Sequence, residues 1–373
     1  MLTVWGILLI TLLLTLLAEQ IKTKKYRGNF VEKNKIIDPF YSVAIIIAVI
    51  YSGLRSSIGD TGYYMYSYKY LSSNFLDIFS QKDWGFTLYQ SIIKIIYPHP
   101  QALLIITSLI TISLIFLALR KESPDITFSV FLFFVGGTYV ASMNGIRQYL
   151  VGAVLFYASS LIFQEKKIKY FFVVLVAATL HNSALIMLPI YFIVRQKAWT
   201  IRTIILLFAL TAGFLGFDTF FSILSPLLES TQYSHYINNI LMESDQGANM
   251  FRALVAFIPV LLSFMYRKKL KLKMNYYNIY VNFSLLNFIV ISFASYNWIF
   301  ARLSIYFDLY NLVLVPAIFY YCFDKKTKII LQYVAICFYL VYFYYDLQPH
   351  NYASYYLHIN RELIGPLTRS FYN

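Results

Sequence analysis

Long apolar segments separated by short polar segments occupy nearly the whole chain. A perpendicular membrane helix needs about 20 predominantly apolar residues, and most of these segments approach that length. The pattern therefore predicts an all-α, polytopic integral membrane protein of about 12 transmembrane segments, forming a single domain over residues 1–373. The predicted spans are 2–18, 40–54, 102–119, 126–141, 145–163, two halves of 170–194, 201–217, 250–266, 277–296, 302–323 and 329–345.

Two apolar segments depart from this pattern. Residues 84–97 number only 14 and include Lys94, so they predict a re-entrant or interfacial helix rather than a span. Residues 170–194 are apolar except for the step His181, Asn182, Ser183. A single span here would place the basic cluster that follows it outside the cell. A break near His181 into two short tilted helices returns that cluster to the cytoplasm, and we expect this form.

Composition supports a membrane protein and excludes a soluble one. Hydrophobic residues make up 59% of the chain and charged residues 13%, so a soluble fold could not cover its apolar surface. The net charge of +14 does not indicate nucleic-acid binding, because the basic residues form short clusters between apolar spans. By the positive-inside rule these clusters are cytoplasmic. The loops at about 55–100 and 218–249 and the tail 347–373 are then external.

Four arginines are predicted to gather at the external face. Arg147, Arg252 and Arg302 each lie near the outer N-terminal end of a helix that runs inward, and Arg55 follows the second span. Free N–H groups and the helix dipole favour an anion at such ends, and guanidinium binds phosphate oxygens in a bidentate way. With Gln148, which follows Arg147, they predict a phosphate or pyrophosphate site. The alternative for Arg147 is an interfacial side chain that reaches the lipid headgroups.

Two side chains are candidate general bases. His181 lies at the predicted break, and Asp60 lies in a glycine-containing loop beside Arg55. The alternatives are a structural histidine with one satisfied nitrogen and an aspartate paired with Arg55. If Asn144, Arg147 and Gln148 belong to one helix, their spacing places them on one face. No metal-ligand or cofactor motif is recognisable, so we expect neither a metal nor a cofactor.

Four motifs occur in order along the chain: RxxxGDxxxY from Arg55 to Tyr64, IRQ at 146–148, LHxSALIxLP from Leu180 to Pro189 and RLSIYF from Arg302 to Phe307. This ordered set resembles the EpsG family, which belongs with the Wzy-type polymerases. The resemblance extends from about residue 40 to 325 and implies a helical bundle like those of Wzy and GT-C glycosyltransferases. It also implies a polymerase of oligosaccharide repeat units carried on undecaprenyl pyrophosphate, acting at the outer face of the bacterial cytoplasmic membrane. A chain-length regulator and a flippase of the same pathway are possible partners.

Two other functions remain open at this stage. A lipid-linked oligosaccharide flippase should line a central cavity with charges from both halves, whereas here the charges gather at the external ends. An O-antigen ligase shares the pyrophosphate chemistry and differs in its acceptor, so the sequence discriminates poorly between ligase and polymerase. For either enzyme we expect catalysis without a metal ion, because arginines can stabilise the leaving pyrophosphate.

Overall fold

The computed structural model describes residues 2–25, 38–56, 58–71, 75–203, 250–296 and 298–347, with isolated positions between 205 and 216. All regular secondary structure in these ranges is helical, which confirms the all-α prediction. The predicted span 201–217 falls largely outside the described residues. The predicted loop 218–249 and residues 348–373 of the predicted tail fall wholly outside them.

The chain divides into two compact units. One comprises Met1–Ile186 together with Phe323–Asn373, and the other comprises Met187–Cys322. The first boundary lies inside the apolar segment 170–194, where the hydrophobic pattern predicts one continuous domain. No polar linker marks it. Each unit is described below by itself.

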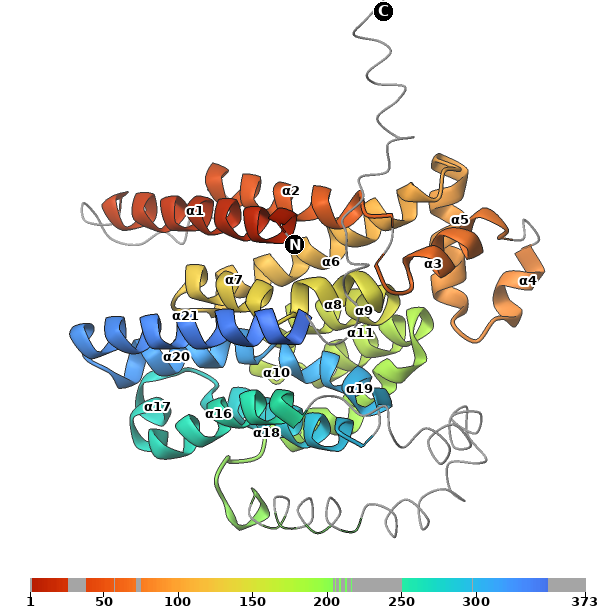
Figure 1. Cartoon of the computed structure of the whole chain (residues 1–373). Helices are drawn as coiled ribbons and strands as arrows, with labels where there is room; N and C mark the ends of the chain where they lie inside the picture. The colour runs from red at the N-terminus through yellow and green to blue at the C-terminus, as the bar shows by residue number, and fades with distance from the viewer. Residues whose placement is uncertain are drawn as a thin grey trace, which may run out of the picture. The chain divides into compact units, whose positions relative to one another are not determined.

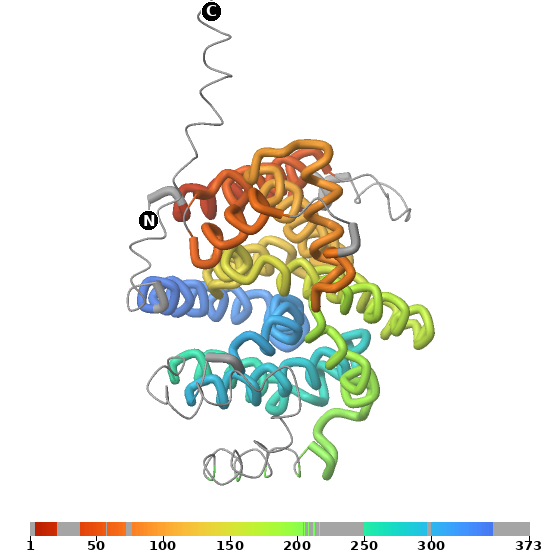
Figure 2. The backbone as a smooth tube through the Cα atoms, turned by 90° about the vertical axis from the view of Figure 1, so that its right-hand side faces the viewer, coloured from red at the N-terminus to blue at the C-terminus, as the bar shows by residue number. Residues whose placement is uncertain are grey.

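The first unit contains most of the helices, which are coloured red to yellow-green, with the blue α21, in Figures 1 and 2. Helices α1 and α2 pack together, α2 packs on α6, and α6 packs on α9. The helices of this unit are α1 (Leu2–Lys25), α2 (Pro39–Gly53), α3 (Thr61–Lys69), α4 (Phe75–Ser80), α5 (Trp84–Ile96), α6 (Gln101–Glu122), α7 (Ile126–Val135), α8 (Thr138–Asn144), α9 (Ile146–Tyr157), α10 (Ser159–Phe163), α11 (Lys167–Leu180), the 3₁₀ helix η1 (Asn182–Ile186) and α21 (Lys325–Leu347).

Helix α5 begins and ends as the short apolar segment predicts. It spans 13 residues and packs against α6 and α11. The ammonium group of Lys94 donates to the carbonyl oxygens of Lys69 at 3.0 Å and Leu71 at 3.1 Å. These carbonyls lie at the C-terminal end of α3, where a cation also meets the negative end of the helix dipole. Lys94, whose charge is unusual in an apolar helix, therefore joins α5 to α3 through these hydrogen bonds.

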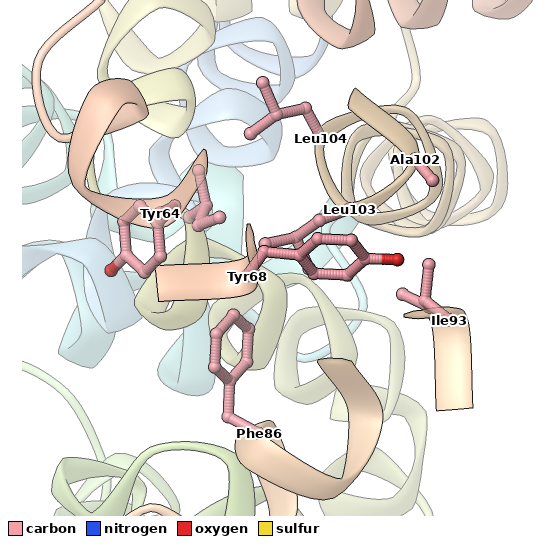
Figure 3. Packing of buried hydrophobic residues seen from close by; sticks show 8 residues of the cluster. Tyr64, Tyr68, Phe86, Ile93, Ala102, Leu103 and Leu104 are labelled. Atoms are coloured by element: carbon pink, nitrogen blue, oxygen red, sulfur yellow. The ribbon is translucent and has the colours of Figure 1, made fainter. Parts of the chain in front are cut away.

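A hydrophobic cluster fixes α3 and α5 against α6 (Figure 3). Tyr64 and Tyr68 of α3 are 5% and 0% exposed and pack with Phe86 of α5. The hydroxyl of Tyr68 also donates to the carbonyl of Tyr97 at 2.7 Å. The remaining buried members of the cluster are Ile93, Ala102, Leu103, Leu104 and Ile146. Because Ile146 begins α9, the cluster extends from α3 to the start of α9.

The second unit consists of α12 (Met187–Val194), α16 (Met250–Met265), α17 (Arg267–Lys273), α18 (Tyr277–Ala294), α19 (Trp298–Asp308) and α20 (Asn311–Cys322) in its described part. Residues 267–273, which form the basic cluster between the predicted spans 250–266 and 277–296, are a helix bent by 81° from α16. Lys269 and Lys273 donate to carbonyl oxygens of residues 322 and 321 at the end of α20. The lysines therefore cap the C-terminal end of α20 and join α17 to it.

Four helices of the described chain are long and apolar enough to cross a membrane, and up to seven are if each bent pair counts as one span. Three further apolar helices are shorter: Val4–Gln20, Pro39–Gly53 and Asn182–Val194. The helices support a membrane protein, but the count of about 12 spans is not confirmed. One physical reason is that apolar runs break into short pieces, as α7 and α8 do, with a bend of 52°. Gly137 permits that break by adopting a φ of 84°.

Candidate functional site

Two segments of the first unit, the start of α9 and residues 181–182, meet at the carboxylate of Asp83. Nη1 of Arg147 lies 3.0 Å from Oδ2 of Asp83, and Nδ1 of His181 lies 3.2 Å from the same oxygen. The backbone N–H of Asn182 donates to the other oxygen, Oδ1, at 3.1 Å. Two of the predicted site residues, Arg147 and His181, are thus brought together by an aspartate that is not among the predicted site residues.

Helix ends present all of these groups. Asp83 immediately precedes α5, and His181 follows α11 in an extended conformation, with φ −155° and ψ 112°. The predicted break at His181 is confirmed, and it directs the N–H of Asn182 to the carboxylate. A Cβ atom added at Gly85 would lie 2.2 Å from Oγ1 of Thr179. The glycine therefore lets the start of α5 approach the end of α11 closely enough for these bonds.

Arg147 is the second residue of α9 and is held on several sides. Its Nε donates to the hydroxyl of Tyr64 at 3.2 Å, and its Cζ lies 5.6 Å from the ring centroids of both Tyr64 and Phe86. Figure 3 shows these two rings in the cluster that joins α3 to α5. Cation–π contacts and a hydrogen bond orient the guanidinium without using all of its five N–H groups.

The helix assumed for Asn144, Arg147 and Gln148 is interrupted. Asn144 ends α8 and Gly145, with φ −84° and ψ 59°, separates it from α9. The prediction that the three side chains share one helical face is therefore wrong. The physical reason is that Gly145 leaves the helical region of φ and ψ, so the relation between positions i and i+3 does not hold across it. Gln148 is also 6% exposed, so little of it is open to a ligand.

The carboxylate of the cluster is well covered, and its two partners are more open. The side-chain exposures are 13% for Asp83, 30% for Arg147 and 25% for His181. Burial raises the pKa of Asp83, but the hydrogen bond and charge of His181, the Asn182 N–H and the charge of Arg147 outweigh it. The pKa of Asp83 therefore lies below its ordinary value, and the carboxylate is ionised at neutral pH.

An ionised Asp83 determines how His181 is protonated. A carboxylate only accepts hydrogen bonds, so Nδ1 of His181 carries the proton that faces it. Nε2 is then left with a free lone pair in the neutral ring. In the described part of the chain, no residue forms a hydrogen bond with Nε2. The arrangement can accept a proton at Nε2 next to a guanidinium that can bind an anion.

Arg55, which the sequence predicts as an external anion-binding residue, is buried. Its side chain is 1% exposed. Nε donates to the hydroxyl of Thr61 at 3.1 Å, and Nη1 donates to the carbonyl of Ser52 and to the hydroxyl of Ser108 at 3.3 Å. Burial lowers its pKa to about 10, which leaves the guanidinium charged at neutral pH. These contacts indicate that Arg55 holds the segment between α2 and α3, and a role in binding substrate stays a prediction.

Asp60 is fixed to the same helix break that precedes Arg147. Its backbone N–H donates to Oδ1 of Asn144 at 2.9 Å. The adjacent Gly59 has a φ of +49°, and a Cβ added there would lie 2.1 Å from that oxygen. In the described part of the chain, Asp60 and Arg55 do not form the ion pair that the alternative expects. The role of Asp60 as a base stays a prediction.

Arg252 and Arg302 belong to the second unit. Arg252 is the third residue of α16, within its first turn, and Arg302 is the fifth residue of the 11-residue α19. Their convergence with Arg147 on one substrate stays a prediction. Within the described ranges, no group of three or more His, Cys, Asp or Glu residues could hold a metal ion.

A comparison with protein families gives one finding. The family model described as EpsG family matches residues 39–358, which is most of the chain. The match includes every candidate site residue discussed above. No curated protein and no solved structure matches the chain.

Proposed function

The chain belongs to the EpsG family, and we propose that it polymerises lipid-linked oligosaccharide repeat units. Membership in this family indicates a polysaccharide-polymerase type of function and a glycosyltransferase-like enzyme. In the proposed reaction the growing glycan leaves undecaprenyl pyrophosphate and is transferred to a hydroxyl of the incoming lipid-linked repeat. The reaction takes place at the outer face of the bacterial cytoplasmic membrane.

The observation that carries the proposal is the meeting of Arg147 and His181 at Asp83. The transfer needs a group that accepts the hydroxyl proton and a group that stabilises the departing pyrophosphate. A histidine with its Nδ1–H bound to a carboxylate and a partly exposed arginine supply these two functions side by side. The apolar helices of the chain are consistent with a membrane-embedded, lipid-carried substrate.

In the proposed step, the acceptor oxygen attacks the anomeric carbon and forms the new glycosidic bond. The bond from that carbon to the pyrophosphate oxygen breaks, and its electron pair stays on the pyrophosphate. The hydroxyl proton moves to Nε2 of His181. The imidazolium that forms is stabilised by Asp83, to which its Nδ1–H remains bound.

The charges of Arg147, Asp83 and His181 suit this proton transfer. With neutral His181, the positive charge of Arg147 and the negative charge of Asp83 balance. Proton transfer makes the cluster positive by one unit while negative charge develops on the pyrophosphate. Arg147 retains N–H groups beyond those bound by Asp83 and Tyr64, and these can bind a phosphate oxygen. We expect the reaction to need no metal ion, and activity of the purified protein in excess chelator tests this.

A gene deletion separates the proposed function from its alternatives. A strain without the polymerase should accumulate lipid-linked glycan of a single repeat. Loss of a ligase should instead leave long chains that are not transferred to their acceptor, and loss of a flippase should leave repeats on the inner face. Complementation with the wild-type chain should restore long polymer, and complementation with Arg147→Ala should not. Either of the other two accumulation products in the deletion strain would refute the polymerase.

A further inference from the structure

A stripe of exposed tyrosines runs along α3, next to the candidate site. Tyr63, Tyr66 and Tyr70 are 64%, 66% and 63% exposed. Their spacing of three and four residues places them on one helical face. Tyr64 and Tyr68, between them, are buried in the cluster of Figure 3. One side of α3 therefore packs in the core, and the other presents aromatic rings.

The composition of this face differs from that of the faces that suit lipid. The exposed positions on α3 are glycine, lysine and tyrosine, with no aliphatic side chain. Exposed positions on α11 include Ile168, Phe172 and Leu175, and those on α21 include Ile330 and Val334. Lipid tails are contacted by apolar side chains of that kind. A short helix with rings, hydroxyls and an ammonium group matches a ligand that has both apolar and hydroxyl-bearing surfaces.

The stripe is continuous with the site through adjoining aromatic rings. The ring centroids of Tyr63 and Tyr64 lie 5.4 Å apart, and the hydroxyl of Tyr64 accepts the hydrogen bond from Arg147. At the other end, the rings of Tyr66 and Tyr70 lie 4.6 Å apart, and Nζ of Lys69 lies 5.5 Å from the ring centroid of Tyr70. From residue 63 to 70 the helix rises roughly 10 Å, which suits a short oligosaccharide.

We propose that Tyr63, Tyr66 and Tyr70 form a sugar-binding platform that holds the glycan part of the lipid-linked substrate beside Arg147. The C–H face of a sugar ring packs on an aromatic ring, and sugar hydroxyls bond to the phenols at its edge. This inference rests on the proposed function for the identity of the substrate. It adds a binding site for the sugar rings, which the proposed transfer step at Arg147 and His181 does not include.

Equilibrium binding of a lipid-free oligosaccharide to the full-length protein tests the platform. The probe is the repeat unit released from its carrier by mild acid, and binding is followed by saturation-transfer NMR in lipid nanodiscs. Tyr66→Ala should weaken binding about tenfold, which corresponds to about 1.4 kcal/mol. Tyr66→Phe should retain most of the affinity, because it keeps the ring. Tyr333→Ala is the matched control, since Tyr333 on α21 is 65% exposed among aliphatic neighbours.

The same variants distinguish a sugar platform from a membrane anchor. In the polymerisation assay, Tyr66→Ala should raise KM for the lipid-linked repeat and leave kcat nearly unchanged. Wild-type oligosaccharide affinity in Tyr66→Ala would overturn the platform, as would equal weakening by Tyr333→Ala or no binding to the wild-type protein. Because the binding measurement needs no turnover, it can fail while the deletion experiment supports the polymerase, and it can succeed while that experiment refutes it.

Discussion

Replacing Asp83 with asparagine tests the chemical organisation of the site most directly. The two carboxylate oxygens accept three hydrogen bonds, from Arg147, His181 and the backbone of Asn182. An amide of the same shape has only one acceptor oxygen, and its NH₂ group only donates. If that oxygen stays with Asn182, the NH₂ group faces Nδ1 of His181. The ring must then accept at Nδ1 and carry its proton on Nε2, where it can no longer act as a base.

The expected loss is large because the tautomer, and not only a contact, changes. In a Ser-His-Asp triad, the same carboxylate-to-amide change lowers kcat about 10⁴-fold. Side-chain exposures of 13% for Asp83 and 25% for His181 let water compensate in part. We therefore expect polymerisation to fall about 10²- to 10⁴-fold in Asp83→Asn. The charge-assisted hydrogen bonds from Arg147 and His181 are also weakened. After discounting for solvent screening, we expect the free energy of unfolding to fall by about 1–3 kcal/mol.

The assay is the rate of chain growth from purified lipid-linked repeats, at equal amounts of protein in the membrane. Asp77→Asn is the control, because it removes the same charge from an exposed position on α4. Thermal unfolding of both variants separates a folding defect from a catalytic one. If Asp83→Asn is folded and polymerises at the wild-type rate, Asp83 does not set the protonation of His181 and the mechanism is wrong.

Three further predictions follow from the same contacts. Arg147→Lys keeps a positive charge but cannot hold Tyr64 and Asp83 with a planar fork, so chain length should drop sharply; wild-type glycan length on a gel would contradict this. Gly59→Ala should lower the free energy of unfolding by about 1–3 kcal/mol, because the added Cβ would lie 2.1 Å from Oδ1 of Asn144 and the backbone φ is +49°. Gly62→Ala is the control, because no atom lies within 4 Å of a Cβ added there. In thermal unfolding this control should be neutral or slightly stabilising. Because the folded pKa of Asp83 lies below its ordinary value, its stabilising contribution is present above the unfolded pKa and is lost as pH falls through the folded pKa. The stability difference between wild type and Asp83→Asn should therefore shrink as the pH falls below about 4.

Much of the helical organisation could be predicted from the hydrophobic pattern, because the pattern reports where apolar side chains run continuously. The short helix at 84–97 and the break at His181 were both predictable. The short helix followed from the length of its apolar segment and from Lys94. The break followed from the three polar residues 181–183 and from the positive charge of the segment after residue 194. Both rest on the cost of leaving polar groups in an apolar environment.

The number of spans and the break at Gly145 were not predictable in the same way. An apolar run has the same hydropathy whether it forms one straight helix or two bent pieces, as α7 and α8 show. Glycine is compatible with both, since it only permits a break. The spacing of Asn144 and Arg147 therefore indicated a shared face that the actual chain does not have.

Asp83 was found only in the structure, because its importance depends on long-range contacts. It lies 64 residues from Arg147 and 98 from His181 along the chain. Its sequence neighbours indicate no more than an aspartate before a helix. The signal that could have found it is electrostatic: a charged Arg147 and a polar break at His181 in one unit require a nearby acceptor, and few carboxylates were available on that side.

The positions of these groups at helix ends follow from the membrane environment. A charged side chain in the middle of an apolar helix would face lipid or core, and its desolvation would be uncompensated. A helix end offers free backbone N–H groups and room for water, and irregular backbone is tolerated where protein surrounds it. Asp83 before α5, Arg147 after the break at Gly145 and His181 after α11 all use such ends. The breaks that interrupt the apolar pattern therefore place the acid–base and anion-binding groups within contact of one another.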